Sequence, residues 1–287
     1  MRLTILGSGT SQGVPVIGCS CKVCTSLDSR DKRFRCSLYV EGSGGERAII
    51  DTGPEFRLQA LRAGIKSLDA IFLTHAHADH IHGLDDIRQL SWEKTIPIYG
   101  NSPTIKEFRE RFSYIFKTTQ RGGGKPQVQP IIVKGPVQLG RLVFIPIPVK
   151  HGNLNIVGWY IIETTENPIS ERKNSDNNGI TVKTGIVYLT DCSHINEEAF
   201  ALIAEAGQPI VAIIGGLRVR PHETHFSFGE AINAGVRMKP NRIYLTHICH
   251  DFLHKEIEDY CRDFVHNYGI SLEAEPAWDG LELEIGE

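Results

Sequence analysis

The sequence predicts an α/β fold with mixed sheets, and three observations support this prediction. Short runs rich in β-branched and aromatic residues alternate with helical stretches along the 287-residue chain, which is typical of α/β proteins. No segment repeats at a spacing of about 20 to 50 residues. Turn-forming residues follow several strand-like runs. The expected strands cover residues 3–6, 37–40, 47–50, 70–73, 96–99, 142–149, 156–163, 186–189, 210–214, 243–245 and 281–285.

Two polar connections indicate that part of the sheet structure is antiparallel. The glycine-rich residues 41–46 and the polar residues 164–181 each separate two strand-like runs, as hairpin connections do. Residues 118–129 contain three consecutive glycines, and we expect a mobile loop over one face there, which leaves open whether residues 101–129 form a lid. No linker divides the chain, so one domain over residues 1–287 is expected.

Helices follow most of the expected strands. Pro54 and Pro103 suit the first turn of a helix, and Ser227 with Glu230 matches a capping box that fixes a helix start. The expected helices cover residues 54–64, 80–91, 103–116, 196–206, 227–237 and 254–267.

The charge balance argues against a dedicated nucleic-acid-binding protein. The chain has 31 Lys and Arg against 34 Asp and Glu, and hydrophobic residues make up 41%. No apolar run approaches the roughly 18 residues of a membrane span, and the start lacks a signal-peptide core. We therefore expect a cytoplasmic globular protein without a membrane partner, and a homodimer stays open. Seven cysteines, an odd number, form a poor disulfide framework and a better metal site in a reducing compartment.

Three expected strands end in the same pattern. Each is followed by Thr and then a potential metal ligand, namely His75, Asp191 and His247. We expect these strand ends to meet at one rim of the sheets, because scaffolded active sites are built from loops at one edge.

The strongest motif is His75-Ala-His77-Ala-Asp79-His80. In an extended turn, His75 and His77 point to the same side and can share one ion, whereas Asp79 and His80 lie beyond the bend and can face a second. A lone histidine is usually a surface or hydrogen-bonded core residue, but burying four such side chains without a metal would be costly. His82, just past the motif, is either a supporting or a solvated residue.

More ligands must come from distant segments, and His151, Asp191 and His247 are the candidates. Asp191 is the best candidate for a shared ligand, because a carboxylate can bridge two cations. The His-x-His-x-Asp-His motif, the Asp51-Thr-Gly53 turn and these three residues resemble the metallo-β-lactamase superfamily along the whole chain. The resemblance implies an αββα sandwich whose dinuclear centre lies at one edge of the two sheets.

By the same resemblance, each metal ion has its own ligand set. His75, His77 and His151 would hold one ion, while Asp79, His80 and His247 would hold the other and Asp191 would bridge them. True β-lactamases of this fold tend to have Cys at the bridging position. An Asp there favours the branches that cleave phosphodiesters or thioesters.

A second cluster contains Cys19, Cys21 and Cys24 within six residues. Three thiolates at this spacing favour a closed, structural zinc site with a histidine as fourth ligand, and His250 is the candidate. The alternative is a set of free thiols or a redox pair. The other cysteines are expected to be small core residues: Cys36, Cys192, Cys249 and Cys261.

The cysteine run, the Gly7-x-Gly-Thr-x-Gln-Gly-Val-Pro15 opening and the Trp278-Asp-Gly-Leu-Glu282 ending resemble a narrower group. This is the phosphoribosyl cyclic phosphate phosphodiesterase group of bacterial phosphonate breakdown. The related pyrroloquinoline quinone biosynthesis protein also has a cysteine-rich zinc loop but lacks a complete dinuclear ligand set. Since all seven ligand positions are filled here, catalysis is favoured.

The expected activity is hydrolysis of a small cyclic phosphate or another small phosphodiester. Two divalent ions, zinc or manganese, would lower the pKa of a shared water towards about 7 and supply a hydroxide. Asp79 and His225 are the expected catalytic residues. In the resembling phosphodiesterases and tRNA 3′-processing nucleases, a histidine matching His225 contacts phosphate or acts as general acid. Further expected substrate contacts are His222, His194, Arg218 and Arg220, although a solvated surface position is as good an explanation for each.

Three other functions stay open. A tRNA 3′-processing-like endoribonuclease would want a basic stripe, whereas the basic residues here form a short run interrupted by two glutamates; that run could bind a phosphorylated small molecule as a lid. A thioester hydrolase would share the dinuclear ligands without needing His225, and a non-catalytic biosynthesis protein would bind zinc without turnover. The run comprises Lys106, Arg109, Arg111, Lys117, Arg121 and Lys125.

Overall fold

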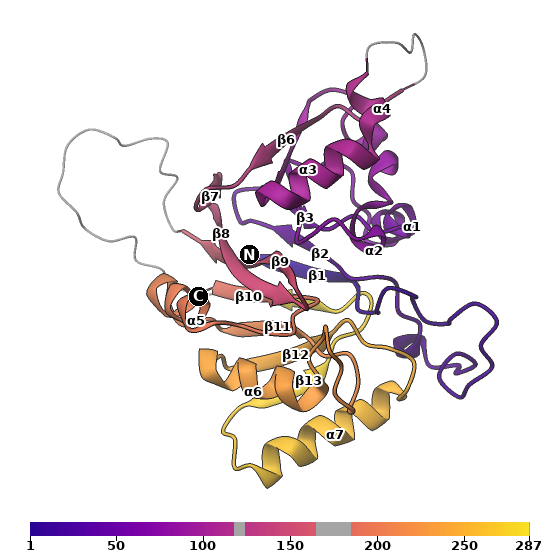
Figure 1. Cartoon of the computed structure of the whole chain (residues 1–287), viewed down its shortest axis with the longest axis vertical. Coiled ribbons are helices and arrows are strands. Elements are labelled where there is room, and N and C mark those ends of the chain that lie inside the picture. Colours follow the sequence, from indigo (N-terminus) through magenta and orange to yellow (C-terminus); the bar gives the residue numbers. More distant parts are fainter. Residues whose placement is uncertain (118–123, 165–184, 287) are drawn as a thin grey trace, which may run out of the picture.

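The computed structural model describes residues 1–117, 124–164 and 185–286, so the glycine-rich loop centre and most of the polar segment 164–181 lie outside the described residues. Figure 1 shows two β-sheets stacked face to face, with helices outside both. The strands are β1 (Arg2–Gly7), β2 (Ser37–Glu41), β3 (Arg47–Ile50), β4 (Ala70–Phe72), β5 (Ile96–Gly100), β6 (Val128–Ile132), β7 (Val137–Leu139), β8 (Leu142–His151), β9 (Leu154–Glu163), β10 (Gly185–Leu189), β11 (Val211–Gly215), β12 (Arg242–Thr246), β13 (Glu273–Pro276) and β14 (Glu282–Glu284).

The α-helices lie on the outside of the sheets (Figure 1). One apolar cluster packs α5, α6 and α7 on the sheet that contains β7 to β13. Another packs α1, α3 and a 3-10 helix, η2, on the sheet that contains β1 to β6 and β14. The helices are α1 (Phe56–Arg62), α2 (Ala78–Ile81), α3 (Ser102–Arg111), α4 (Ser113–Phe116), α5 (Glu197–Ala206), α6 (Phe228–Met238) and α7 (His254–Asn267), with 3-10 helices η1 (Ser29–Asp31) and η2 (Leu84–Gln89).

The two sheets share one strand pattern. Their orders are β14-β1-β2-β3-β4-β5-β6 and β13-β12-β11-β10-β9-β8-β7, with seven strands in each. Each sheet has three antiparallel and three parallel pairings. The antiparallel ones lie at the β14 end of the first sheet and at the β7 end of the second. A third apolar cluster lies between the sheets, where the Phe72 ring stacks on Phe144 at 3.8 Å. The αββα sandwich implied by the resemblance is therefore confirmed.

The strands missed by the sequence analysis share one property. β6, β7 and β13 are all outermost strands of their sheets. Edge strands bury one side and tolerate proline and charge, and β6 contains Pro130 while β13 reads Glu-Ala-Glu-Pro. Their sequences therefore lack the apolar signature that marks a central strand.

Three expected helices differ from those observed. The expected helix over residues 80–91 is divided into α2 and η2, with Gly83 between them. A side chain at Gly83 would meet the Gly53 carbonyl oxygen at 1.9 Å, so this position requires glycine, which disfavours a continuous helix. The helix expected over 103–116 breaks at Phe112, and α1 begins after Pro54 rather than at it. The capping box of Ser227 and Glu230 is confirmed. In the described part of the chain, no helix has the length and hydropathy needed to cross a membrane.

Candidate metal centre

The three strand ends with the Thr-ligand pattern converge on one rim of the sandwich, as expected. His75 follows β4, Asp191 follows β10 and His247 follows β12. The rim joins the two sheets, because the Val157 amide of β9 donates to the Thr74 carbonyl at 3.0 Å. Ligands from both sheets can therefore meet there.

The backbone is left-handed at three rim residues. Asp51, Asp191 and His247 have φ angles of 61°, 53° and 59°. This conformation is uncommon outside glycine, and Asp and His tolerate it better than most residues. Each residue turns the chain sharply where its strand ends, and such strained positions concentrate at functional sites.

The first ligand group contains His75, His77 and His151, whose ligand nitrogens lie within 4.8 Å of one another. His151 ends β8, and its Nδ1 lies 2.8 Å from the Thr224 carbonyl oxygen. That contact makes Nδ1 the donor and leaves Nε2 free to bind a cation. A carbonyl that orients a histidine in this way is a common support for a metal ligand.

The second group contains Asp79, His80, Asp191 and His247, all buried. The Asp191 Oδ2 atom lies 3.0 Å from His80 Nε2 and 3.0 Å from His247 Nδ1. Asp191 also belongs to a further cluster with His151 and His225. It therefore lies between the two groups, where a shared ligand is expected.

Asp51 supports this second group, a role that the sequence analysis missed. Its carboxylate accepts hydrogen bonds from the Thr74 amide at 2.8 Å and the Thr74 hydroxyl at 2.7 Å, and it lies 2.7 Å from His80 Nδ1. His80 Nε2 is thus turned towards Asp79 and Asp191. The Asp51-Thr-Gly53 turn was a signal, but its partners become clear when β3 and β4 lie side by side.

The site is electrostatically prepared for a cation. Burial opposes a charge on His80, but Asp191, Asp79 and Asp51 outweigh it and raise the His80 pKa well above its usual value. Burial likewise opposes a charge on Asp191, yet His247 and His80 hold its pKa well below normal. Carboxylates that stabilise a charged imidazole here can equally stabilise a divalent cation.

Two buried atoms fit such a cation. His75 Nε2 is buried without a hydrogen-bond partner, and a buried polar atom without a partner is costly. His80 Nε2 is also buried, and it makes no well-formed hydrogen bond although Asp191 Oδ2 lies 3.0 Å away. Each belongs to a different ligand group. The donors are imidazole nitrogens and carboxylate oxygens, a set that suits zinc and manganese. The described residues therefore fit two divalent ions.

His225 lies beside both groups. Its Nδ1 is 3.7 Å from Asp191 Oδ1, and its ring centre is 4.6 Å from that of His151 and 4.8 Å from that of His247. Burial, followed by the nearby charge of His247, lowers the His225 pKa to about 3. An anionic group bound nearby would favour the charged ring.

The other expected substrate contacts are placed differently. The His222 ring is exposed and lies 5.2 Å from that of His225. Arg218 is half-buried, and its Nε has no partner. Arg220 instead faces Asp251 at 3.7 Å, while His194 is exposed and its backbone bridges to Lys150. Of the four, His222 has a ring contact with His225.

Two further expectations concern neighbouring residues. His82 is exposed, which favours a solvated position, and its ring lies 6.1 Å from that of Phe112. In the basic run, Arg109 stacks over Phe116 at 5.0 Å, and Arg111 pairs with Glu107 at 2.7 Å. Arg121 lies outside the described residues, so the lid stays a prediction.

The cysteine cluster forms on a long excursion between β1 and β2, residues 9–33, which we call the arm. Its three sulfur atoms surround His250 Nδ1 at 3.5 Å for Cys19, 3.5 Å for Cys21 and 3.4 Å for Cys24. The structure thus brings together the four residues expected to hold zinc. The remaining cysteines are buried, as expected.

Comparison with known proteins places this geometry in a family. Residues 46–248 match the family model described as "Beta-lactamase superfamily domain". The crystal structure of a new diphosphatase from the PhnP family has a TM-score of 0.78 and 35% identity, with 99% of this chain and 98% of that chain covered. Zn²⁺-bound PqqB from Methylobacterium extorquens has the same fold, with a TM-score of 0.73 and 18% identity over 99% of this chain and 100% of that one.

One curated relative is longer. An octanoyltransferase of Porphyromonas gingivalis is 34% identical over 291 residues, which cover 100% of this chain and 52% of the relative. The chain therefore spans about half the length of that protein. The family model, the sandwich and the rim cluster agree: the chain belongs to the metallo-β-lactamase superfamily and has the fold of a metal-dependent hydrolase.

Proposed function

We propose that this chain is a dinuclear metal hydrolase that cleaves a small phosphodiester, such as a cyclic phosphate. One observation carries the proposal. Two adjacent ligand groups share a rim with His225, whose Nδ1 lies 3.7 Å from the carboxylate placed between them. Such a site can bind a phosphate and place a proton donor beside it.

Seven residues would hold the two ions, which we propose to be zinc or manganese. Bound ions of this kind supply a hydroxide at neutral pH and neutralise charge on phosphate oxygens. The ligands are His75, His77 and His151 for one ion, Asp79, His80 and His247 for the other, and Asp191 for both. A third ion, zinc, would be held by Cys19, Cys21, Cys24 and His250 in a structural role.

The chain's own residues orient the substrate and move the proton. His225 would contact the phosphate and donate a proton to the leaving oxygen. His222, beside it, would contact the outer part of the substrate. The carboxylate of Asp79 would hold its ion beside the reacting group, which is the sense in which we count it as catalytic.

Two findings support a small substrate. The diphosphatase from the PhnP family aligns over nearly the whole chain at 35% identity, so a phosphoric anhydride is a reasonable relative of the expected phosphodiester. The net charge of −3 does not favour the tRNA-processing alternative, because nucleic-acid binding relies on Lys and Arg neutralising phosphates.

A substrate panel on protein of known metal content tests the proposal. The panel contains bis(p-nitrophenyl) phosphate, phosphoribosyl 1,2-cyclic phosphate, 2′,3′- and 3′,5′-cyclic nucleotides and a nucleoside diphosphate. We expect turnover of at least one phosphodiester that depends on zinc or manganese. Inert phosphodiesters together with a reactive thioester would refute the proposal, and bound zinc with no turnover at all would favour the non-catalytic alternative.

A thioester hydrolase is the second candidate. The observation that favours it is the 34% identity to one half of a protein named octanoyltransferase, which links this kind of chain to acyl transfer. An octanoyl thioester therefore belongs in the panel. The His225→Ala variant separates the two functions, because thioester cleavage would not need a proton donor for an alkoxide leaving group.

A further inference from the structure

Two ligands of different sites lie three residues apart. His247 follows β12 and faces the rim, while His250 faces the thiols of the arm. The intervening residues form no helix or strand.

The start of segment 247–254 is held by backbone hydrogen bonds from outside it. The Ile248 N–H donates to the Ser8 carbonyl at 2.9 Å and the Cys249 N–H donates to the Leu217 carbonyl at 3.1 Å. The residues from 250 to 254 need other contacts.

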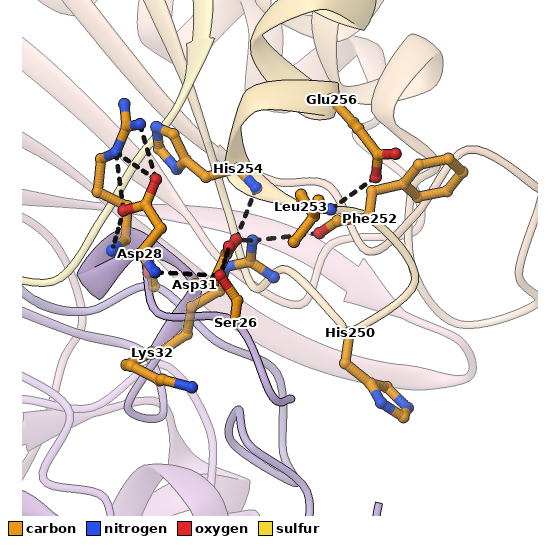
Figure 2. Close-up of polar contacts among 12 residues, drawn as sticks. Ser26, Asp28, Asp31, Lys32, His250, Phe252, Leu253, His254 and Glu256 are labelled. Atoms are coloured by element: carbon orange, nitrogen blue, oxygen red, sulfur yellow. Dashed lines mark hydrogen bonds and ion pairs between the residues drawn. The ribbon is translucent and has the colours of Figure 1, made fainter. Parts of the chain in front are cut away.

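Two side chains of the arm, Arg33 and Asp31, form hydrogen bonds to the backbone of this segment. The Arg33 guanidinium donates from Nη1 to the Cys249 carbonyl at 2.7 Å and from Nη2 to the Phe252 carbonyl at 3.3 Å. The Asp31 carboxylate accepts the backbone N–H of His254 at 2.6 Å, at the start of α7. Figure 2 shows Asp31 reaching this N–H, with His250 turned away on the same segment.

Arg33 and Asp31 are buried, and their opposite charges pair with each other. The side chains of Arg33 and Asp31 are 0% and 2% exposed, and they form an ion pair at 3.1 Å. The Ser26 hydroxyl donates to the second carboxylate oxygen of Asp31 at 2.6 Å. A buried ion pair adds little net stability compared with apolar residues, so its retention is better explained by the geometry that it imposes.

We propose that Asp31 and Arg33 are a positioning pair that holds residues 247–254 in one conformation, so that His247 faces the rim and His250 faces the arm. Arg33 suits this task because its planar fork places a separate nitrogen on each of two carbonyls, whereas a lysine carries all its donors on one nitrogen at the end of a flexible chain. The proposal rests on the metal sites of the proposed function.

The test substitutes Arg33 and follows each site separately. In cobalt-substituted protein, the thiolate-to-cobalt absorption reports the Cys₃His site, and metal release to a chelator is timed. We expect Arg33→Met to speed release of the thiolate-bound ion and of one rim ion about 10- to 100-fold. The rim ion held by His75, His77 and His151 should keep its wild-type rate. Arg33→Lys should lie between, because it keeps the charge and loses the fork.

A second readout needs no metal. In metal-free protein, the amides of residues 249–254 should exchange about tenfold faster in Arg33→Met, while those of β10 stay unchanged. The control is Lys22→Met, on the same arm. It breaks the exposed pair of Lys22 with Glu256 of α7 and should behave as wild type. If Arg33→Met does not fold, Arg33→Lys decides by the same criteria.

The proposal is overturned if the folded Arg33 variant has the same metal-release rates and amide exchange rates as Lys22→Met. It is also overturned if the release of all ions is accelerated by the same factor. A wild-type protein without thiolate-to-cobalt absorption would refute the zinc site and the positioning pair together. If wild type shows the absorption and Arg33→Met shows the selective release, but wild type hydrolyses nothing, the proposed function fails and the positioning pair stands.

Discussion

The rim and the arm place their metal-ligand residues by different means. At the rim, four ligand residues are each at most 3% exposed: His75, His80, Asp191 and His247. Three of them follow strands of the two packed sheets, and His80 lies in α2. On the arm, the buried apolar cluster consists of Val14, Val23 and Cys24. Two aliphatic side chains of the arm, Ile17 and Leu27, are 100% exposed.

The difference indicates that bound ions have different roles at the rim and on the arm. The sandwich core orients the rim ligands, so the ions there are needed for chemistry. The arm has too small a core to hold its own shape, and a cross-link by zinc would supply what burial does not. We therefore expect the rim to keep its structure without metal, while residues 16–28 of the arm lose theirs and the buried pair of Asp31 and Arg33 stays in place.

The largest expected effect concerns the rim. His225→Ala should lower kcat for a phosphodiester about 10² to 10⁴-fold, because the variant loses the proton donor but none of the ligands. Steady-state kinetics on protein with measured metal content checks this. His266→Ala, on the exposed side of α7, is the control. An unchanged rate, or a loss of metal, would remove His225 from its role.

Removing metal with a chelator should separate the two regions. We expect the amides of residues 16–28 to exchange at least about 10²-fold faster in the metal-free protein, while those of β10 and β12 keep their protection. Hydrogen exchange followed by mass spectrometry measures both in one experiment. Equal loss of protection in both regions would contradict the comparison.

Asp279 forms hydrogen bonds at both ends of the arm. Its titration should change the free energy of unfolding with pH. Its carboxylate accepts the amides of Ser8 at 2.9 Å and Phe34 at 2.6 Å, on either side of the arm. Burial raises the pKa of Asp279 from 3.8 to about 6. A carboxyl whose pKa is higher in the folded protein favours folding while protonated, and this contribution is lost as pH rises through the folded pKa.

Asp279→Asn should remove this dependence. Between about pH 4 and pH 7, the free energy of unfolding of wild type should fall by about 3 kcal/mol relative to that of the variant. Urea unfolding across the pH range measures the difference, and Asp263→Asn, at an exposed position on α7, is the control. Parallel pH profiles for wild type and Asp279→Asn would show that Asp279 keeps an ordinary pKa.

Asp51→Asn should have the smallest effect of the four. Asn tolerates the left-handed φ of 61° as well as Asp does, so the change tests the acceptors alone. An amide cannot accept from Thr74 and His80 on both of its ends. We expect about a 10- to 100-fold loss of metal affinity at the rim, with the arm site unchanged in a competition titration. Equal weakening at both sites would point to a general loss of structure instead.

The sequence predicted the central strands and the ligands that follow them, but not three of the edge strands. The Thr-ligand endings of β4, β10 and β12 identified the rim, because central strands carry a clear apolar signature and rigid strands fix the position of the residues just after them. The edge strands β6, β7 and β13 carry no such signature and were missed. The capping box at Ser227 was predictable because it is local.

The supporting residues could not be predicted, since their roles depend on distant contacts. Asp51 reaches His80 across 29 positions, and Arg33 reaches Cys249 across 216. Nothing near either residue in the sequence marks its partner. The expected ligands His250 and Asp191 were found because metal-binding side chains are few and their chemistry limits the choice.

Counting metal ions per chain in wild type and in Asp191→Ala tests the central claim most directly. We expect three ions in wild type. In the variant we expect the loss of at least the ion that Asp191 holds together with Asp79, His80 and His247, while the thiolate-bound ion stays. A wild type that binds a single ion, or a variant that retains all three or loses the thiolate-bound ion as well, would contradict that claim.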